Sequence, residues 1–291
     1  MIIVDLGNSQ YKMIVGDKKI KDCSNVQLVS AGTFGAFEIE GKHYLFGEGA
    51  KAKRSTNKIC EEKRALLGRV LYPIVNDKDK VNITTLLPLS LYVNQENKIK
   101  YAELLKGRYT VTNANGARKT FTVASVDVCC ESFSSLVTDS SLLQQALYLV
   151  DIGGVDLSGV LVNRTPDVNK MFTIEKGMNI LNVELAKVLT SKLLESYSDK
   201  EVELLLNKFG SLPEEYRAII DEFMEEYIKV NIYEPLKEIG YKPLIHKLVF
   251  CGGGSSALQR YLSKDSNATI LEDSIYTNVL GAKILSTRRS K

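Results

Sequence analysis

The chain has 291 residues, of which 44% are hydrophobic and 25% are charged, a composition typical of a soluble globular protein of about two domains. Its 38 basic and 35 acidic residues leave a net charge of +3, which argues against a nucleic-acid or membrane surface over the whole molecule. No apolar run is long enough to span a membrane, and the first residues lack the features of a signal peptide. With five cysteines, no Cys-x-x-Cys pair and two histidines, we expect reduced thiols, no zinc site and a cytoplasmic location.

The chain begins with a strand, a polar turn and a second strand. Residues 2–6 are apolar except for an acid, residues 7–10 contain a glycine, and residues 11–16 resume β character. Glycine lets backbone N–H groups approach a phosphate closely, and polar turn side chains add donors. For the lysine on the second strand, a role in binding phosphate and a role as a solvated surface charge are equally favoured. The groups that we expect at a phosphate here are Asp5, Gly7, Asn8, Ser9 and Lys12.

The next part of the chain predicts a small β-rich region. A strand at 26–30 is followed by a hairpin at 37–46, whose turn is at 40–42. Residues 51–64 are polar with few apolar anchors, so we expect them to be exposed. We interpret about 31–65 as an outer subdomain.

Helices and strands then alternate. Residues 65–75 and 97–105 have helical patterns, and the apolar run 81–92 predicts a buried strand that stops at Pro88. An Asn-Gly pair at 115–116, between two alternating segments, predicts a hairpin.

Glu131 is an acid at the end of a predicted strand. The strand covers 126–130, and a helix is expected at 132–145. An acid at this place also suits a helix N-terminus, because the helix dipole favours negative charge there. On the residues alone, a site residue and a helix-terminal acid both remain open.

The pattern of strand, acid, turn and strand occurs again at 147–162. An apolar strand ends near an acid, two adjacent glycines follow, and a second apolar strand begins. An ordinary β-turn explains this segment taken alone, but its likeness to the N-terminus favours a second phosphate-binding hairpin. The acid suits a metal-bound water. The residues expected here are Asp151, Gly153, Gly154 and Asp156.

A short strand at 171–174 leads through residues 175–177 into a helical block, which we interpret as an insert at about 180–243. Gly240 is expected to end the last helix of this block. The expected helices are 179–197, 199–209 and 213–239.

Three consecutive glycines follow a predicted strand at 247–251 and open a helix that reaches residue 262. Such a turn accommodates sugar and phosphate, because the helix N-terminus and bare backbone are accessible. A last helix is expected at 273–285. The chain has neither a Walker A motif nor a Gly-x-Gly-x-x-Gly that opens a helix, so hairpins rather than a P-loop are expected to hold a nucleotide. The glycines are Gly252, Gly253 and Gly254.

Two halves with the same opening pattern predict a duplicated α/β architecture with a cleft between the halves. In five segments, in the expected order, the sequence resembles the actin/Hsp70/sugar-kinase superfamily. Within it the chain is most similar to the ParM/StbA-type bacterial actins, in its short length, its Leu87-Pro88-Leu89 segment and its Glu131-Ser132 pair. Its region after residue 35 is shorter than is typical. The segments are the phosphate motifs at 5–12 and 151–156, the adenosine motif at 249–254 and the connecting helices at 128–132 and 278–281.

The resemblance implies a ribonuclease H-like fold of two actin-like domains around a nucleotide cleft. Domain I covers 1–150, with the outer subdomain at about 31–65. Domain II covers 151–291, with the helical insert at about 180–243.

The resemblance further implies ATP hydrolysis coupled to filament assembly, with ATP or ADP, or GTP instead, and Mg²⁺. Glu131 and Asp151 are implied to position or activate the attacking water, and Asp5 and Asp151 to hold the metal through water. The other implied nucleotide contacts are Gly7, Asn8, Ser9, Lys12, Gly153, Gly154, Asp156, Glu175, Lys176, Gly177, Gly252, Gly253, Gly254 and Leu258.

For a segregation actin the resemblance implies a homopolymer and a small DNA-binding adaptor on a centromere-like plasmid site. Direct DNA binding by this chain is not expected from its charge, and no membrane partner is expected. Three alternatives remain: a small-molecule kinase of the same superfamily, a different bacterial actin that forms a cell-shape or scaffold filament, and a nucleotide-sensing chaperone or scaffold with negligible turnover.

Overall fold

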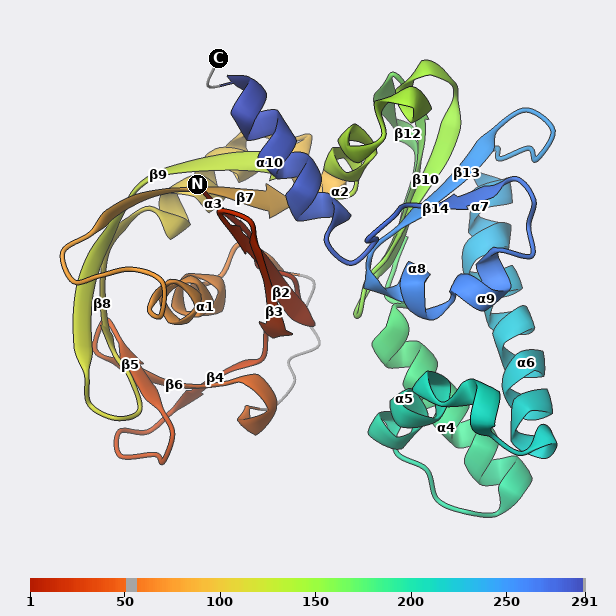
Figure 1. Ribbon diagram of the computed structural model, residues 1–291, viewed down its shortest axis with the longest axis horizontal. Coiled ribbons are helices and arrows are strands. Elements are labelled where there is room, and N and C mark those ends of the chain that lie inside the picture. Colours follow the sequence, from red (N-terminus) through yellow and green to blue (C-terminus); the bar gives the residue numbers. More distant parts are fainter. Residues whose placement is uncertain (51–56, 290–291) are drawn as a thin grey trace. The chain divides into compact units, whose positions relative to one another are not determined.

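The structure is a computed structural model that describes residues 1–50 and 57–289 (Figure 1). The chain divides into two compact units. One is Met1–Thr138 with Asn278–Lys291, and the other is Asp139–Thr277. The expected domain ranges 1–150 and 151–291, with their outer subdomain and helical insert, stay predictions.

The first unit is built on a nine-stranded sheet in the order β3-β2-β1-β7-β9-β8-β5-β6-β4. Strand β1 pairs antiparallel with β2 and parallel with β7, which pairs parallel with β9. The carboxyl ends of β1, β7 and β9 therefore lie at one edge of the sheet. The strands are β1 (Ile2–Asp5), β2 (Gln10–Val15), β3 (Lys18–Cys23), β4 (Val26–Val29), β5 (Phe37–Ile39), β6 (Lys42–Phe46), β7 (Lys80–Leu87), β8 (Gly107–Thr112) and β9 (Arg118–Cys130).

The curved sheet of this unit encloses α1, as Figure 1 shows. The helix buries Leu66, Leu67, Val70 and Leu71, at the spacing of one helical face. Gly68 faces strand β8, where a Cβ atom would lie 3.2 Å from the Tyr109 ring. The helical segments of the unit are η1 (Gly47–Gly49), α1 (Glu61–Leu71), α2 (Leu89–Tyr92), α3 (Gln95–Leu105), η2 (Phe133–Thr138) and α10 (Thr277–Arg289), where η marks non-α turns.

The second unit repeats the central topology of the first. Its sheet has the order β12-β11-β10-β13-β14, in which β10 pairs antiparallel with β11 and parallel with β13. The outer pairs also match, since β2–β3 and β11–β12 are antiparallel, while β7–β9 and β13–β14 are parallel. The predicted α/β duplication is therefore confirmed. The strands are β10 (Leu147–Ile152), β11 (Leu157–Asn163), β12 (Thr165–Ile174), β13 (Lys247–Cys251) and β14 (Ala268–Ile270).

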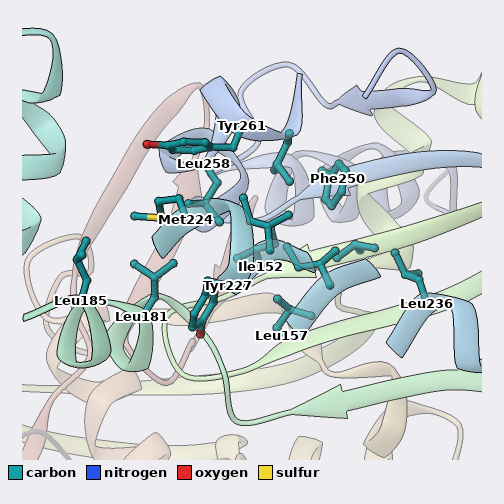
Figure 2. Packing of buried hydrophobic residues seen from close by; sticks show 14 of the residues in the cluster. Ile152, Leu157, Leu181, Leu185, Met224, Tyr227, Leu236, Phe250, Leu258 and Tyr261 are labelled. Carbon is teal, nitrogen blue, oxygen red and sulfur yellow. The ribbon is translucent and has the colours of Figure 1, made fainter. Parts of the chain in front are cut away.

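Helices of the second unit cover its sheet through one hydrophobic core. Figure 2 shows Leu181, Leu185, Met224 and Tyr227 converging on Ile152. Burial of such side chains is worth roughly 2 kcal/mol each relative to exposure. The helical segments are η3 (Ser140–Gln144), α4 (Met178–Leu193), α5 (Asp199–Asn207), η4 (Phe209–Ser211), α6 (Glu214–Ile228), η5 (Lys229–Tyr233), α7 (Glu234–Glu238), α8 (Gly253–Ala257) and α9 (Gln259–Leu262).

Several predicted elements differ from the structure at their ends. The strand predicted in the apolar run 81–92 stops at Pro88 as expected, because proline cannot continue a ladder, but residues 89–92 of the run are helical. The helix expected over 213–239 changes to π geometry at Lys229–Tyr233 and ends, as predicted, before Gly240 at φ +96°. Strands β3 and β14 were not predicted, and β12 begins earlier than expected.

The helix expected over 132–145 is instead a pair of short 3₁₀ segments. Hydroxyl groups explain the difference, because they accept or donate locally and compete with regular helix bonds. The Ser134 hydroxyl donates to the Cys130 carbonyl and the Ser135 hydroxyl donates to the Ser132 carbonyl, each at 2.5 Å.

The expectation that 51–64 is exposed holds for Asn57 and Glu61 but is wrong for most of the described part of this segment. Residues 51–56 lie outside the described residues. Lys58 is 2% exposed and Lys63 is 6% exposed, and α1 begins at Glu61, four residues before the expected start. The sequence does not indicate this burial, because a lysine in a polar segment predicts an exposed side chain. In the folded chain an ammonium group can be buried beside carboxylates.

Candidate functional site

The first hairpin places an acid and a lysine side by side. Asp5 ends β1 opposite Lys12 on β2, and directly opposed residues in antiparallel strands share a face. The Lys12 Nζ atom lies 4.0 Å from Asp5 Oδ2, and the Asp5 side chain is 1% exposed. Gly7 allows the turn to close, because a Cβ atom there would lie 2.2 Å from the Gln10 carbonyl oxygen. Asn8 and Ser9 follow in the turn, partly exposed.

Two further lysines reach this turn from the segment before and within α1. Lys58 Nζ lies 3.5 Å from Asp5 Oδ1 and 3.2 Å from Glu131 Oε2. Lys63 Nζ donates a 2.8 Å hydrogen bond to the Gly7 carbonyl. Burial, and next the charge of Lys58, lower the pKa of Lys63 to about 7.

Glu131 follows the end of β9, at the same sheet edge as Asp5. Its backbone N–H donates to the Leu87 carbonyl at 2.7 Å, which holds this residue beside the end of β7. The next residue, Ser132, has φ +63°, and its N–H donates to Asn278 Oδ1 at 2.9 Å. Helix α10 thus fixes the turn that carries Glu131.

Helix α10 packs very closely against this turn. A Cβ atom on Gly281 would lie 1.7 Å from the Ser134 carbonyl oxygen, so only glycine permits the approach. Farther along, the Ser286 and Thr84 hydroxyls are 3.0 Å apart, which ties α10 to β7 (Figure 1).

Two hydroxyl groups are buried near the charged side chains of the first unit. Thr85 and Tyr101 are both fully buried, and neither hydroxyl has a hydrogen-bond partner of good geometry among the described residues. Burial raises the pKa of Tyr101 to about 12, while the charge of Lys58 acts in the opposite direction. Buried hydroxyls of this kind need a water or a ligand atom to complete their bonding.

The second hairpin is closed by its own backbone. Asp151, half-buried, lies opposite Ser158 in the β10–β11 ladder. The Gly153 N–H donates to the Asp156 carbonyl at 2.9 Å, and a Cβ atom on Gly153 would lie 3.0 Å from Asp156 Oδ1. Glycine and aspartate therefore shape this turn together.

The start of α4 docks on the same turn. The N–H groups of Met178 and Asn179 donate to the Gly153 and Gly154 carbonyls at 3.0 and 2.8 Å. A Cβ atom on Gly177 would lie 2.6–2.7 Å from backbone atoms of residues 153–155. These bonds fix the hairpin turn against the helical block.

The triple-glycine turn packs against the end of β10. Gly252 has φ +85°, and a Cβ atom there would lie 2.2 Å from Asp151 Oδ1. A Cβ atom on Gly254 would lie 2.3 Å from Ile152 Cγ2, whereas one on Gly253 would meet nothing within 4 Å. Two of the three glycines are thus required by close contact with β10.

The remaining expected contacts are placed differently. Glu175 is exposed, and Lys176 Nζ donates to Glu184 Oε1 at 2.5 Å. Leu258 is 1% exposed and lies in the hydrophobic core of the second unit, as Figure 2 shows.

In the first unit, the structure brings Asp5, Gly7, Lys12 and Glu131 together. It gathers Asp151, Gly153, Gly154, Asp156, Gly177, Gly252 and Gly254 at the end of β10 in the second.

Sequence reasoning missed Lys58, Lys63 and Asn278. Lys63 carried a usable signal, since it precedes Leu66, Leu67 and Val70 by three, four and seven residues and so shares their buried helix face. Lys58 lies before the helix and carried no periodic signal.

The donor set of each unit fits a phosphorylated ligand. The first unit offers the partly exposed ammonium group of Lys12 beside a glycine turn, and the second offers glycine turns that a Cβ would fill. In the part of the chain that the structure describes, no three His, Cys, Asp or Glu side chains converge as direct metal ligands. A magnesium ion held through water needs fewer protein ligands than that. No helix within 1–50 and 57–289 has the length and apolar character to cross a membrane.

Comparisons with known proteins bear on the fold of the chain. Residues 4–133 match the family described as "Actin like proteins N terminal domain". No curated protein matches the sequence significantly.

Solved structures match over nearly the whole chain. The actin-like protein Alp7A has a TM-score of 0.83 at 18% identity, over 99% of this chain and 96% of that one. The archaeal actin homolog Ta0583, in a complex with ADP, has a TM-score of 0.75 at 17% identity, over 99% and 100%. The apo psk41 ParM protein has a TM-score of 0.72 at 16% identity, over 100% and 98%.

Proposed function

We propose that this chain, whose residues 4–133 form an actin-like N-terminal domain within an actin-like fold, is an ATPase that assembles into filaments with ATP and Mg²⁺. The observation that carries the proposal is the repeated hairpin: β1 ends at Asp5, β10 has Asp151 as its next-to-last residue, and each hairpin then turns through a required glycine. The resemblance of the sequence to ParM-type actins implies a role in plasmid segregation through a small DNA-binding adaptor, and the likeness in fold to a ParM protein agrees with that resemblance.

In this proposal the hairpins bind the phosphates of one nucleotide. Lys12 and the N–H groups of residues 7–9 donate to phosphate oxygens, as do the N–H groups of residues 154 and 155, whereas the Gly153 N–H donates to the Asp156 carbonyl within the turn. Asp5 and Asp151 would hold the metal through its bound water, by accepting hydrogen bonds from that water. When bound, Mg²⁺ offsets the negative charge that develops on the transferred phosphate.

Glu131 and Asp151 orient the attacking water by accepting its hydrogen bonds. Glu131 suits this role because two contacts fix its position. Its backbone N–H donates a hydrogen bond to β7, and its carboxylate forms an ion pair with Lys58. The Gly252–Gly254 turn packs against Asp151, and its backbone, which carries no side chains, contacts the nucleoside.

The test is to add Mg-ATP to the purified protein and to follow light scattering, pelleting and phosphate release. We expect polymer to form with ATP and to shorten as phosphate is released. A protein that hydrolyses ATP yet stays monomeric at micromolar concentration contradicts the filament. Turnover that requires an added sugar or acid acceptor assigns a small-molecule kinase instead.

Glu131→Gln tests the water-orienting role. We expect assembly to persist while phosphate release slows by about 100-fold or more, the usual contribution of a general base. Glu103→Gln, on the exposed face of α3, is the matched control and keeps wild-type turnover. If Glu131→Gln abolishes nucleotide binding, the residue binds nucleotide rather than water.

A further inference from the structure

Lys58 is a buried, positively charged residue that belongs to neither hairpin. Its ammonium lies between two carboxylates, 3.5 Å from Asp5 Oδ1 and 3.2 Å from Glu131 Oε2, and its side chain is 3% exposed. Lysine is almost never so buried unless it is paired, since the desolvation of an unpaired charge is costly. The contacts therefore mark a fixed position for this side chain.

The sheet explains why such a bridge is needed. Strand β7 separates β1 from β9, so Asp5 and Glu131 share no backbone ladder that could fix their distance. Two carboxylates brought to one edge repel each other. An ammonium between them attracts both and fixes their separation.

The neighbouring lysines do not make this bridge. Lys12 Nζ lies 4.0 Å from Asp5 Oδ2 on the strand opposite, and Lys63 Nζ donates to the Gly7 carbonyl. Of the three lysines in the first unit's site, Lys58 is the one whose ammonium group lies within 4.0 Å of both acids among the described residues.

We propose that Lys58 is a positioning residue that holds the Glu131 carboxylate at a fixed place relative to Asp5, and that it supplies the positive charge there before nucleotide binds. Its effect on turnover rests on the proposed ATPase function. Its effect on the nucleotide-free protein does not, because the two ion pairs exist without ligand.

The first experiment uses nucleotide-free protein and measures thermal unfolding of the wild type, Lys58→Met and Lys58→Arg with increasing MgCl₂. Without Lys58 the acids lack their bridging cation, so we expect Lys58→Met to melt lower and to be rescued by Mg²⁺. The wild type and Lys58→Arg should respond little. Equal melting temperatures and equal Mg²⁺ responses for all three proteins overturn the proposal.

A double variant keeps the test decisive if Lys58→Met folds poorly. Removing one acid relieves the repulsion, so Lys58→Met combined with Glu131→Gln should melt higher than Lys58→Met alone. Strictly additive losses mean that the two residues do not interact, which contradicts the bridge. Lys100→Met, which removes an exposed lysine paired on its own helix, is the control for loss of charge.

The second experiment measures phosphate release and separates kcat from KM. Lys58→Met should lower kcat by about 100-fold through misplacement of Glu131, with a smaller change in KM, and Lys58→Arg should restore part of kcat. Wild-type kcat in Lys58→Met overturns the positioning role. If the wild type hydrolyses no ATP, the proposed function fails, and the nucleotide-free experiment still decides the role of Lys58.

Discussion

The two units share one strand order but stabilise their strand-end acids by different means. In the first, Asp5 is 1% exposed and the ammonium groups of Lys12 and Lys58 lie within 4.0 Å of it. In the second, Asp151 is half-buried, and the backbone of Gly252 lies so close that a Cβ atom would be 2.2 Å from its Oδ1. The strand order thus determines where each acid lies, while the groups around the acid determine its environment. Charged side chains surround Asp5 in the first unit, and closely packed backbone surrounds Asp151 in the second.

The largest expected effect comes from filling the close approach in the second unit. Gly252→Ala adds a Cβ both at positive φ and against Asp151, so we expect a loss of about 3 kcal/mol or more in unfolding free energy. Gly253→Ala is the neighbouring control and should change stability by less than about 0.5 kcal/mol, because its Cβ meets nothing within 4 Å. Urea unfolding measures both, and equal losses would show that close backbone packing is not what specifies this turn.

A smaller effect is expected from a side-chain contact in the first unit. Asn278→Ala removes the acceptor of the buried Ser132 N–H, which costs about 1–3 kcal/mol. Because Ser132 has φ +63°, the same change should also loosen the adjacent Glu131 and reduce phosphate release. Asn163→Ala, at an exposed strand end, is the control. Unchanged stability and turnover in Asn278→Ala would mean that α10 does not hold this turn.

The smallest effect, counted per pH unit, is a pH dependence from Lys63. Its pKa is about 7 in the folded protein and about 10.4 when unfolded, so between these values the unfolded chain binds more protons. Stability therefore rises with pH through this window, by up to about 1 kcal/mol per pH unit, and the penalty is fully present below pH of about 7. Urea unfolding of nucleotide-free protein should show this slope in the wild type and a flatter one in Lys63→Met. Parallel slopes would contradict the buried position of Lys63.

The duplication and the acids could be predicted from sequence because both are local patterns. Asp5 and Asp151 each follow an apolar run and precede a glycine turn, and Gly252–Gly254 follow a strand in the same way. Lys58 could not be found this way, because its partners are 53 residues before it and far along the chain after it. Burial of a charge depends on partners that only the folded sheet brings together.

The 3₁₀ segments after Glu131 escaped prediction for a related reason. Ser134 and Ser135 suit a helix start in sequence, yet their hydroxyls bond backward to carbonyls, and Gly281 of a distant helix packs on the Ser134 carbonyl. Tertiary contact therefore overrides the local helical preference.

The function proposed above requires both hairpins, which differ in chemistry, to bind one nucleotide. The most direct measurement is a structure of the protein with Mg²⁺ and a non-hydrolysable ATP analogue. We expect Lys12 and the N–H groups of residues 7–9 on the phosphates, the N–H groups of residues 154 and 155 on phosphate oxygens, and Asp151 on the metal or water side of the γ-phosphate. A nucleotide held by one hairpin alone, with Asp151 far from the γ-phosphate, would contradict it.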